Sequence, residues 1–106
     1  MIRGVTLSGG EPFLQAESLV PFAKLTKERG LNLIAYTGYY FEELLNLSKT
    51  NQYIIELLKY IDVLIDGPFE LDKKDLSLPF RGSRNQRLVD VKQSLSIGEA
   101  IILQKI

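Results

Sequence analysis

Short apolar runs alternate with longer amphipathic segments along the first two thirds of the chain. Runs of strand length, each followed closely by glycine, occur at three places: Val5–Leu7, Leu31–Tyr36 and Val63–Ile65. Between them, apolar residues at helical spacing predict helices over 18–29, 41–47 and 53–60. Ser18 is the expected cap of the first helix, which places Pro21 in the first turn, where its missing N–H removes no intrahelical hydrogen bond.

The order of strands and helices predicts an α/β fold with right-handed parallel crossovers. The alternation of predicted strands and helices becomes less regular after residue 70. The pattern there predicts a long loop over 71–87, a short strand over 88–91, a turn over 96–98 and a final edge strand over 100–103. We therefore expect a single small domain over 1–106, with a β/α core over about 4–69 and a loop and terminal strands over 70–106.

Charge and hydropathy exclude several classes of partner. The 106 residues include 13 basic and 13 acidic side chains, so the formal net charge is zero and favours neither nucleic acid nor an anionic membrane. No apolar run approaches the roughly 20 residues of a membrane span. The N-terminus has no long apolar core of a secretory signal, so we expect a cytoplasmic protein without membrane or nucleic-acid partners.

The chain contains neither cysteine nor histidine. This excludes disulfides, a cysteine nucleophile, a histidine base and a thiolate metal site built from this chain alone. Carboxylates, Lys, Arg, Tyr, hydroxyls and backbone groups are left for any chemistry.

Each predicted strand ends in a polar or glycine-rich turn. Because the carboxyl ends of parallel strands meet at one edge, these turns predict a ligand pocket there. Gly9 and Gly10 lack a Cβ atom and allow close approach of a ligand to the backbone, and Glu11 supplies a negative charge suited to a cation. The alternative is that the glycines form only a tight turn between a strand and a helix.

Other polar residues near these turns have two interpretations each. Asp66 follows an apolar strand and lies either at the edge of the pocket or in a turn with Gly67. Tyr36 either stacks on a ligand ring or belongs to the rim of the core. Arg81, Arg84 and Arg87 either clamp an acidic group or belong to a solvated loop.

Taken together, four segments resemble the radical-SAM activating enzymes of the anaerobic (class III) ribonucleoside-triphosphate reductase. The segments are Gly4–Pro12, Tyr36–Tyr39, Asp62–Phe69 and Arg81–Arg87. The Gly-Gly-Glu-Pro sequence marks the radical-SAM superfamily, whereas the segments at 66–69 and 83–87 point to this subgroup. Pyruvate formate-lyase activase is the nearest relative of this subgroup and the alternative within the same class of enzymes.

The resemblance implies a fragment of the radical-SAM partial (β/α) barrel. In that family three cysteines hold a 4Fe-4S cluster, S-adenosylmethionine (SAM) chelates its fourth iron, and reductive cleavage gives a 5′-deoxyadenosyl radical that abstracts hydrogen from a glycine of a partner glycyl-radical enzyme. The resemblance places the SAM amino group at Ser8, Gly9, Gly10 and Glu11, with Thr37 and Asp66 along the same edge. Tyr36, Asn85 and Arg87 would lie near the site or the partner.

The cluster loop and the first strands of the family are not found in this sequence. We therefore expect the C-terminal part of an activase, without cluster ligands and unable to perform radical chemistry alone. The strand at 5–7 should then have an unpaired apolar edge, which favours self-association. Two alternatives remain: a non-catalytic remnant that binds an adenosyl ligand or a partner protein, and a radical-SAM enzyme of another reaction, such as modified-base synthesis.

Overall fold

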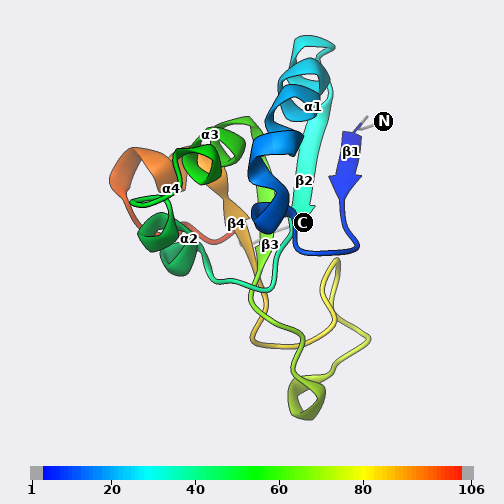
Figure 1. Ribbon diagram of the computed structural model, residues 1–106. Helices are drawn as coiled ribbons and strands as arrows, with labels where there is room; N and C mark the ends of the chain where they lie inside the picture. The colour runs from blue at the N-terminus through cyan, green and yellow to red at the C-terminus, as the bar shows by residue number, and fades with distance from the viewer. Residues whose placement is uncertain (1–3, 104–106) are drawn as a thin grey trace.

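The computed structural model describes residues 4–103. Four strands and four α-helices follow one another in the order β1, α1, β2, α2, α3, β3, β4, α4 (Figure 1). Their bounds are β1 Gly4–Leu7, α1 Ala16–Glu28, β2 Asn32–Tyr36, α2 Phe41–Leu47, α3 Gln52–Tyr60, β3 Val63–Asp66, β4 Arg87–Asp90 and α4 Val91–Ile97. Two short 3-10 turns, Pro12–Gln15 and Leu71–Lys73, complete the regular structure. None of the helices within 4–103 is long and apolar enough to cross a membrane.

The four strands form one sheet in the order β1-β2-β3-β4. β1, β2 and β3 run parallel, with Thr6 beside Ile34 and Tyr36 beside Ile65. β4 returns antiparallel to β3, so that Arg87 is paired with Asp66. The predicted α/β fold with parallel β/α repeats is confirmed for the first three strands, and the antiparallel fourth strand is an addition to it.

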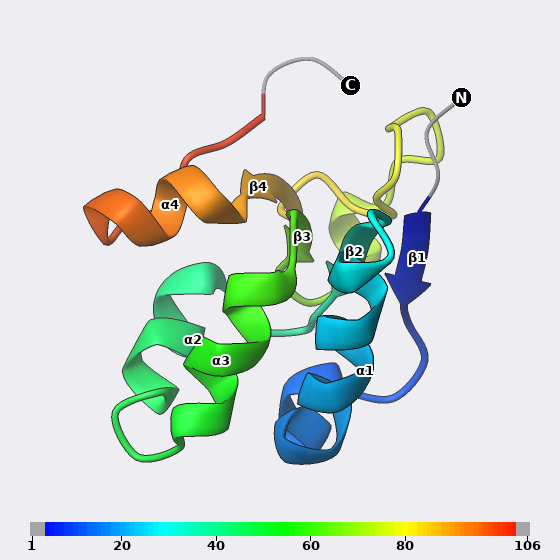
Figure 2. The same cartoon turned by 90° about the horizontal axis from the view of Figure 1, so that it is seen from above.

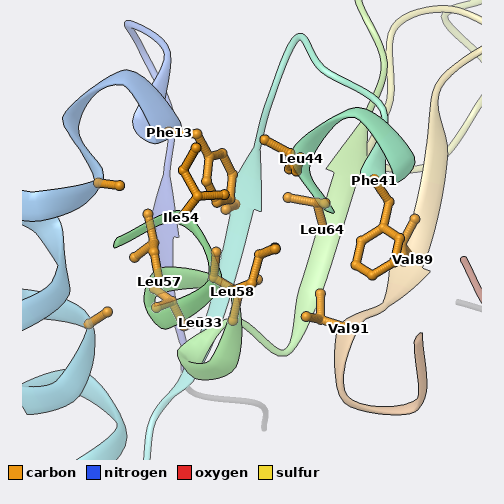
Figure 3. Packing of buried hydrophobic residues seen from close by; sticks show 14 residues of the cluster. Phe13, Leu33, Phe41, Leu44, Ile54, Leu57, Leu58, Leu64, Val89 and Val91 are labelled. Atoms are coloured by element: carbon orange, nitrogen blue, oxygen red, sulfur yellow. The ribbon is translucent and has the colours of Figure 1, made fainter. Parts of the chain in front are cut away.

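The hydrophobic core lies between the sheet and its helices. α1, α2 and α3 cover the same face, and α4 lies at the β4 end (Figure 2). Figure 3 shows side chains from the helices meeting Leu33, Leu64 and Val89 of the strands. Right-handed crossovers between neighbouring parallel strands place their helices on one face, and within residues 4–103 the other face has no helical cover.

The first helix begins earlier than predicted. The 3-10 turn at Pro12–Gln15 continues directly into α1, which starts at Ala16 rather than at Ser18. The Ser18 hydroxyl donates a hydrogen bond to the Gln15 carbonyl and does not cap the helix. Pro21 therefore lies inside α1, where it leaves the Glu17 carbonyl without its usual intrahelical donor.

The C-terminal predictions were wrong in three places. Val91 begins helix α4 rather than ending a strand, because the Asp90 side chain accepts a hydrogen bond from the Gln93 amide and caps the helix. Residues 96 and 97 are its last turn, and Gly98 ends it at φ 81°. The predicted strand over 100–103 is reduced to an isolated bridge between Ile102 and Val89. The loop predicted over 71–87 is irregular apart from its short 3-10 turn, an isolated bridge between Lys74 and Ser83, and Arg87, which begins β4.

Candidate functional site

The turns after β1, β2 and β3 meet at the carboxyl end of the parallel strands, and we call this region the turn edge (residues 8–11, 37–39 and 66–68). It borders an open cavity of about 290 Å³. The cavity is lined by Gly9, Gly10, Glu11, Pro12, Tyr36, Thr37, Gly38, Gly67, Phe69 and Gln86. The loop between β3 and β4 extends past the strand ends beside these turns (Figure 1). The pocket predicted from the strand order is thus present in the structure.

The Glu11 carboxylate joins the first turn to the second. Its Oε2 accepts hydrogen bonds from the Phe13 amide (3.1 Å) and the Thr37 hydroxyl (2.8 Å), and its Oε1 accepts one from the Gly38 amide (2.8 Å). All three donors are neutral, and Glu11 is the only charged residue among those that line the cavity. The cavity therefore carries one negative charge that no cation within its own lining compensates.

Backbone hydrogen bonds join the second turn to the third. The Thr37 amide donates to the Ile65 carbonyl at 3.0 Å, and the Gly67 amide donates to the Tyr39 carbonyl at 2.8 Å. Gly67 adopts φ 99°, and a Cβ atom there would lie 2.7 Å from the Tyr40 ring. Both the backbone conformation and the close approach of Tyr40 therefore require glycine at this position.

Two cavity residues come from the long loop and its start, and the sequence did not mark either as a site residue. Phe69 is 53% exposed although it is a large aromatic side chain. Gln86 fastens the loop to the third turn, since its Nε2 donates to the Gly67 carbonyl and its Oε1 accepts from the Gly82 and Ser83 amides. An aromatic residue directly after Asp66-Gly67-Pro68 was the available signal for Phe69.

Tyr36 lines the cavity and also holds the loop. Its hydroxyl donates a 2.8 Å hydrogen bond to the carbonyl of Phe80. Phe80 adopts φ 66°, which an aromatic residue rarely does. The cavity lining therefore contains two aromatic residues, Tyr36 and Phe69, besides its four glycines.

Asp66 lies at the turn edge but does not line the cavity. Its side chain is fully buried, and its Oδ2 accepts hydrogen bonds from the Phe41 amide (2.7 Å) and from Arg87 Nη2 (2.6 Å). Arg87 Nε donates to Oδ1 at 3.0 Å, which makes the pair bidentate. The carboxylate therefore anchors the first amide of α2 and neutralises Arg87.

Arg87 also contacts Glu42 and Tyr40. Its Nη2 donates to Glu42 Oε1 at 2.7 Å, and the guanidinium carbon lies 5.3 Å from the centre of the Tyr40 ring. The hydrogen bond from Arg87 lowers the pKa of Glu42 despite partial burial. Hydrogen bonding to Asp66, followed by that to Glu42, raises the pKa of Arg87 against the opposing effect of burial. We call Asp66, Arg87 and Glu42 the ion-pair cluster.

The structure brings together some of the predicted site residues and separates others. Gly9, Gly10, Glu11, Thr37 and Tyr36 line one cavity. The remaining predicted residues, Ser8, Asp66, Asn85 and Arg87, do not line it. Asn85 Nδ2 instead donates to the Pro68 carbonyl (2.7 Å) and the Tyr40 hydroxyl (3.1 Å), so Asn85 joins the third turn to Tyr40.

The residues of this chain do not fit an iron–sulfur cluster. The sequence has no cysteine to supply thiolate ligands. Among residues 4–103, no group of three or more Asp and Glu side chains is placed to hold a metal ion either.

Comparison with known proteins relates residues 1–89 to the family described as "4Fe-4S single cluster domain". The chain is also similar to proteins named anaerobic ribonucleoside-triphosphate reductase-activating protein. It is 44% identical to that of Pasteurella multocida and 41% identical to that of Haemophilus influenzae, each over 88 residues that make up 79% of this chain and 53% of the relative. The protein of phage T4 is 39% identical over 93 residues, which are 82% of this chain and 53% of the relative.

The chain thus spans about half the length of the curated relatives that it matches. No solved structure matches it. The resemblance to the activating proteins of anaerobic ribonucleotide reductase, noted in the motifs around Gly9 and Asp66, is confirmed by these relatives. With 89 of its 106 residues matched, this chain belongs to the 4Fe-4S single cluster domain family, although it carries none of the cysteines that such a cluster requires.

Proposed function

We propose that this chain supplies the SAM-binding edge of an activating protein for anaerobic ribonucleotide reductase. The observation that carries the proposal is the cavity at the turn edge, with its single carboxylate, two aromatic side chains and four glycines. SAM is a cation at its sulfonium and ammonium groups and has a flat adenine ring. The carboxylate of the cavity suits these positive charges, its aromatic side chains suit the ring, and its glycines allow close approach of the ligand.

Each feature of the cavity has a proposed role. The Glu11 carboxylate offsets the positive charge of the SAM amino group, because its present partners are all neutral donors. Gly9 and Gly10 admit the ligand close to the backbone, and Tyr36 and Phe69 offer aromatic surface to the adenine ring. Thr37 contributes by holding Glu11 in place through its hydroxyl.

Asp66 and Arg87 are positioning residues in this proposal. The Asp66 carboxylate accepts a hydrogen bond from the Phe41 amide at the start of α2, and Arg87 holds this carboxylate in place through two hydrogen bonds. Ser8 belongs to the first turn and Asn85 is hydrogen-bonded to the third, and neither lines the cavity. The partner that we propose for the activating protein is the anaerobic reductase named in its relatives.

We propose further that the 106-residue chain performs no radical chemistry alone, since it has no thiolate ligand for a cluster. Anaerobic reconstitution with iron and sulfide should therefore give no cluster absorbance and no cleavage of SAM. Cluster absorbance together with release of 5′-deoxyadenosine would contradict this part of the proposal.

Two glycines provide a matched test of the cavity. Gly9 and Gly98 adopt φ 80° and φ 81°, and a Cβ atom at either would meet nothing within 4 Å. Gly9→Ala and Gly98→Ala should thus lose similar stability, about 1–2 kcal/mol each for a left-handed alanine. Only Gly9 lines the cavity, so only Gly9→Ala should weaken the binding of SAM.

The binding is best followed by amide chemical-shift titration of the isotope-labelled chain, because we expect weak affinity. Wild type and Gly98→Ala should show saturable shifts at Gly38 and neighbouring amides on addition of SAM, and Gly9→Ala should show much smaller ones. Absence of shifts in the wild type, or equal shifts in all three proteins, would overturn the proposed site.

A further inference from the structure

The segment between β3 and β4 folds back on itself as a short hairpin, and we call residues 69–86 the hairpin loop. The Asp75 amide donates a hydrogen bond to the Gly82 carbonyl at 3.0 Å. The Arg84 amide donates to the Lys73 carbonyl at 2.9 Å. The hairpin loop is therefore an ordered element of the fold, although it contains no regular strand.

Large apolar side chains are concentrated on the hairpin loop and are exposed there. Among residues 4–103, four of the nine exposed large apolar side chains belong to it: Phe69, Leu71, Leu76 and Phe80. Leu71 and Leu76 are 75% and 81% exposed. Single exposed apolar side chains are common on protein surfaces, whereas a group of them usually marks a contact with another molecule. The hairpin loop therefore has the composition of a binding surface.

The hairpin loop is held against the cavity by residues that line the cavity. The Tyr36 hydroxyl donates to the Phe80 carbonyl at 2.8 Å, and Figure 1 shows the segment around residue 80, in yellow, turning back toward the strand ends. The Phe69 ring packs on Gly82, where a Cβ atom would lie 3.0 Å from it. Since Tyr36 and Phe69 both belong to the cavity lining, a molecule that binds the hairpin loop comes to lie beside the cavity. A surface fixed in this way also loses little conformational entropy on binding.

Three basic residues of the hairpin loop have no acidic partner in the part of the chain that the structure describes. Lys74, Arg81 and Arg84 form no ion pair there, whereas Lys73 binds Glu70 at 3.0 Å. Arg81 also has a buried Nε atom that lacks a hydrogen-bond partner among residues 4–103. An unpaired guanidinium suits a carboxylate, which it can bind through two parallel hydrogen bonds. The hairpin loop therefore fits a partner that presents acidic side chains around an apolar contact.

We propose that the hairpin loop is the surface through which this chain binds the protein that it activates, an inference that rests on the proposed function. The exposed apolar side chains form the centre of the contact, and the unpaired basic residues receive acidic side chains of the partner at its rim. Binding here brings the partner against the cavity proposed for SAM, as activation of that partner requires. The occupant is thus the anaerobic reductase. An anionic membrane is disfavoured by the acidic residues Glu70, Asp72 and Asp75 in the same loop, and a second copy would cover the cavity.

Phe80→Asn tests the apolar centre without unfolding the hairpin loop. Phe80 has φ 66°, a conformation that asparagine adopts more readily, so the variant should be at least as stable as wild type in urea denaturation. Biolayer interferometry measures binding to the purified anaerobic ribonucleoside-triphosphate reductase of Pasteurella multocida, whose activating protein is 44% identical to this chain. Wild type should bind this reductase, and Phe80→Asn should raise the dissociation constant at least about tenfold.

Ile97→Asn is the matched control for this variant. Ile97 is 57% exposed at the end of α4, and Figures 1 and 2 both show α4 on the opposite side of the molecule from the hairpin loop. It removes an exposed apolar side chain in the same way, and it should bind the reductase as wild type does.

Arg84→Glu tests the basic rim. Reversal of this exposed charge should slow association with the reductase at least about threefold at low salt, and the effect should shrink as salt screens the charges. Lys92→Glu makes the same change of charge at an exposed position of α4 and should leave the association rate unchanged.

Several results would overturn the proposal. They are a wild type that does not bind the reductase, and equal binding by wild type and Phe80→Asn. Binding to phosphatidylglycerol vesicles that Phe80→Asn abolishes would assign the surface to lipid instead. A two-copy mass in light scattering that the same variant reduces to one copy would assign it to self-association. The titration with SAM needs no reductase, so a chain that binds the reductase through the hairpin loop but shows no amide shifts with SAM would contradict the proposed SAM site alone.

Discussion

Glu11 and Asp66 lie at the same edge of the sheet, and yet their carboxylates have opposite surroundings. Glu11 lines the cavity and accepts hydrogen bonds from two amides and one hydroxyl. Asp66 is fully buried and forms a bidentate pair with Arg87 as well as a hydrogen bond to the Phe41 amide. One carboxylate keeps its charge available to a ligand, and the charge of the other is neutralised within the protein.

The comparison teaches that the partners of a carboxylate, rather than its place after a strand, decide whether it can serve a ligand. Neutral donors orient Glu11 without cancelling its charge. A guanidinium cancels the charge of Asp66 and occupies its oxygens, so that a ligand could reach it only by breaking an ion pair. Removal of the two carboxylates should therefore affect different properties: stability for Asp66 and ligand binding for Glu11.

The largest effect is expected from Asp66→Ala. It leaves Arg87 partly buried with only Glu42 as a charged partner, and it leaves the Phe41 amide without its acceptor. Loss of one partner of a buried pair costs about 3–5 kcal/mol in the free energy of unfolding. Urea denaturation followed by circular dichroism measures this change.

A double variant separates the loss of the pair from the loss of packing. Asp66→Leu combined with Arg87→Met removes both charges, so it should be less destabilising than the sum of the two single changes. A strictly additive double variant would show that the two side chains do not act as a pair.

Glu11→Gln is expected to lose little stability but much of the affinity for SAM. The amide oxygen can still accept from the Phe13 amide and the Thr37 hydroxyl, and water can replace the acceptor lost at the exposed Gly38 amide, so the loss of stability should be about 1 kcal/mol. The negative charge is lost, however, and titration with SAM should give at least about tenfold weaker binding. A large loss of stability with unchanged binding of SAM would remove the distinction between the two carboxylates.

The regions that sequence could predict are those governed by local pattern. The runs at 5–7, 31–36 and 63–65 became parallel strands, because apolar runs of that length followed by glycine leave few other structures. Parallel strands place their carboxyl ends together, so the meeting of the turns at Gly9, Thr37 and Gly67 followed from the order alone.

The regions that sequence could not predict depend on contacts between distant segments. Asp66 meets Arg87 because β4 returns antiparallel across a long irregular loop, and no local pattern specifies that register. The same return brings Gln86 to the third turn. Helix α4, Val91–Ile97, was missed because its capping residue Asp90 and its first residue Val91 continue the apolar pattern of the preceding strand.

The smallest effect is expected at the exposed end of the ion-pair cluster. Glu42 is 55% exposed at its side chain, so solvent screens its pair with Arg87 and limits its contribution to below about 1 kcal/mol. Because Arg87 lowers the pKa of Glu42 in the folded chain, this contribution is present above the ordinary carboxyl pKa of about 4.3 and is lost as the pH falls through the lowered value.

Glu42→Gln should therefore be slightly less stable than wild type at neutral pH and equal to it in acid, and added salt should also reduce the difference. Urea denaturation of both proteins across this pH range measures the effect. A difference as large as that of Asp66→Ala, or one that persists in acid, would mean that Glu42 contributes through packing rather than charge. Within the ion-pair cluster, burial would then no longer explain why Asp66 stabilises the fold more than Glu42 does.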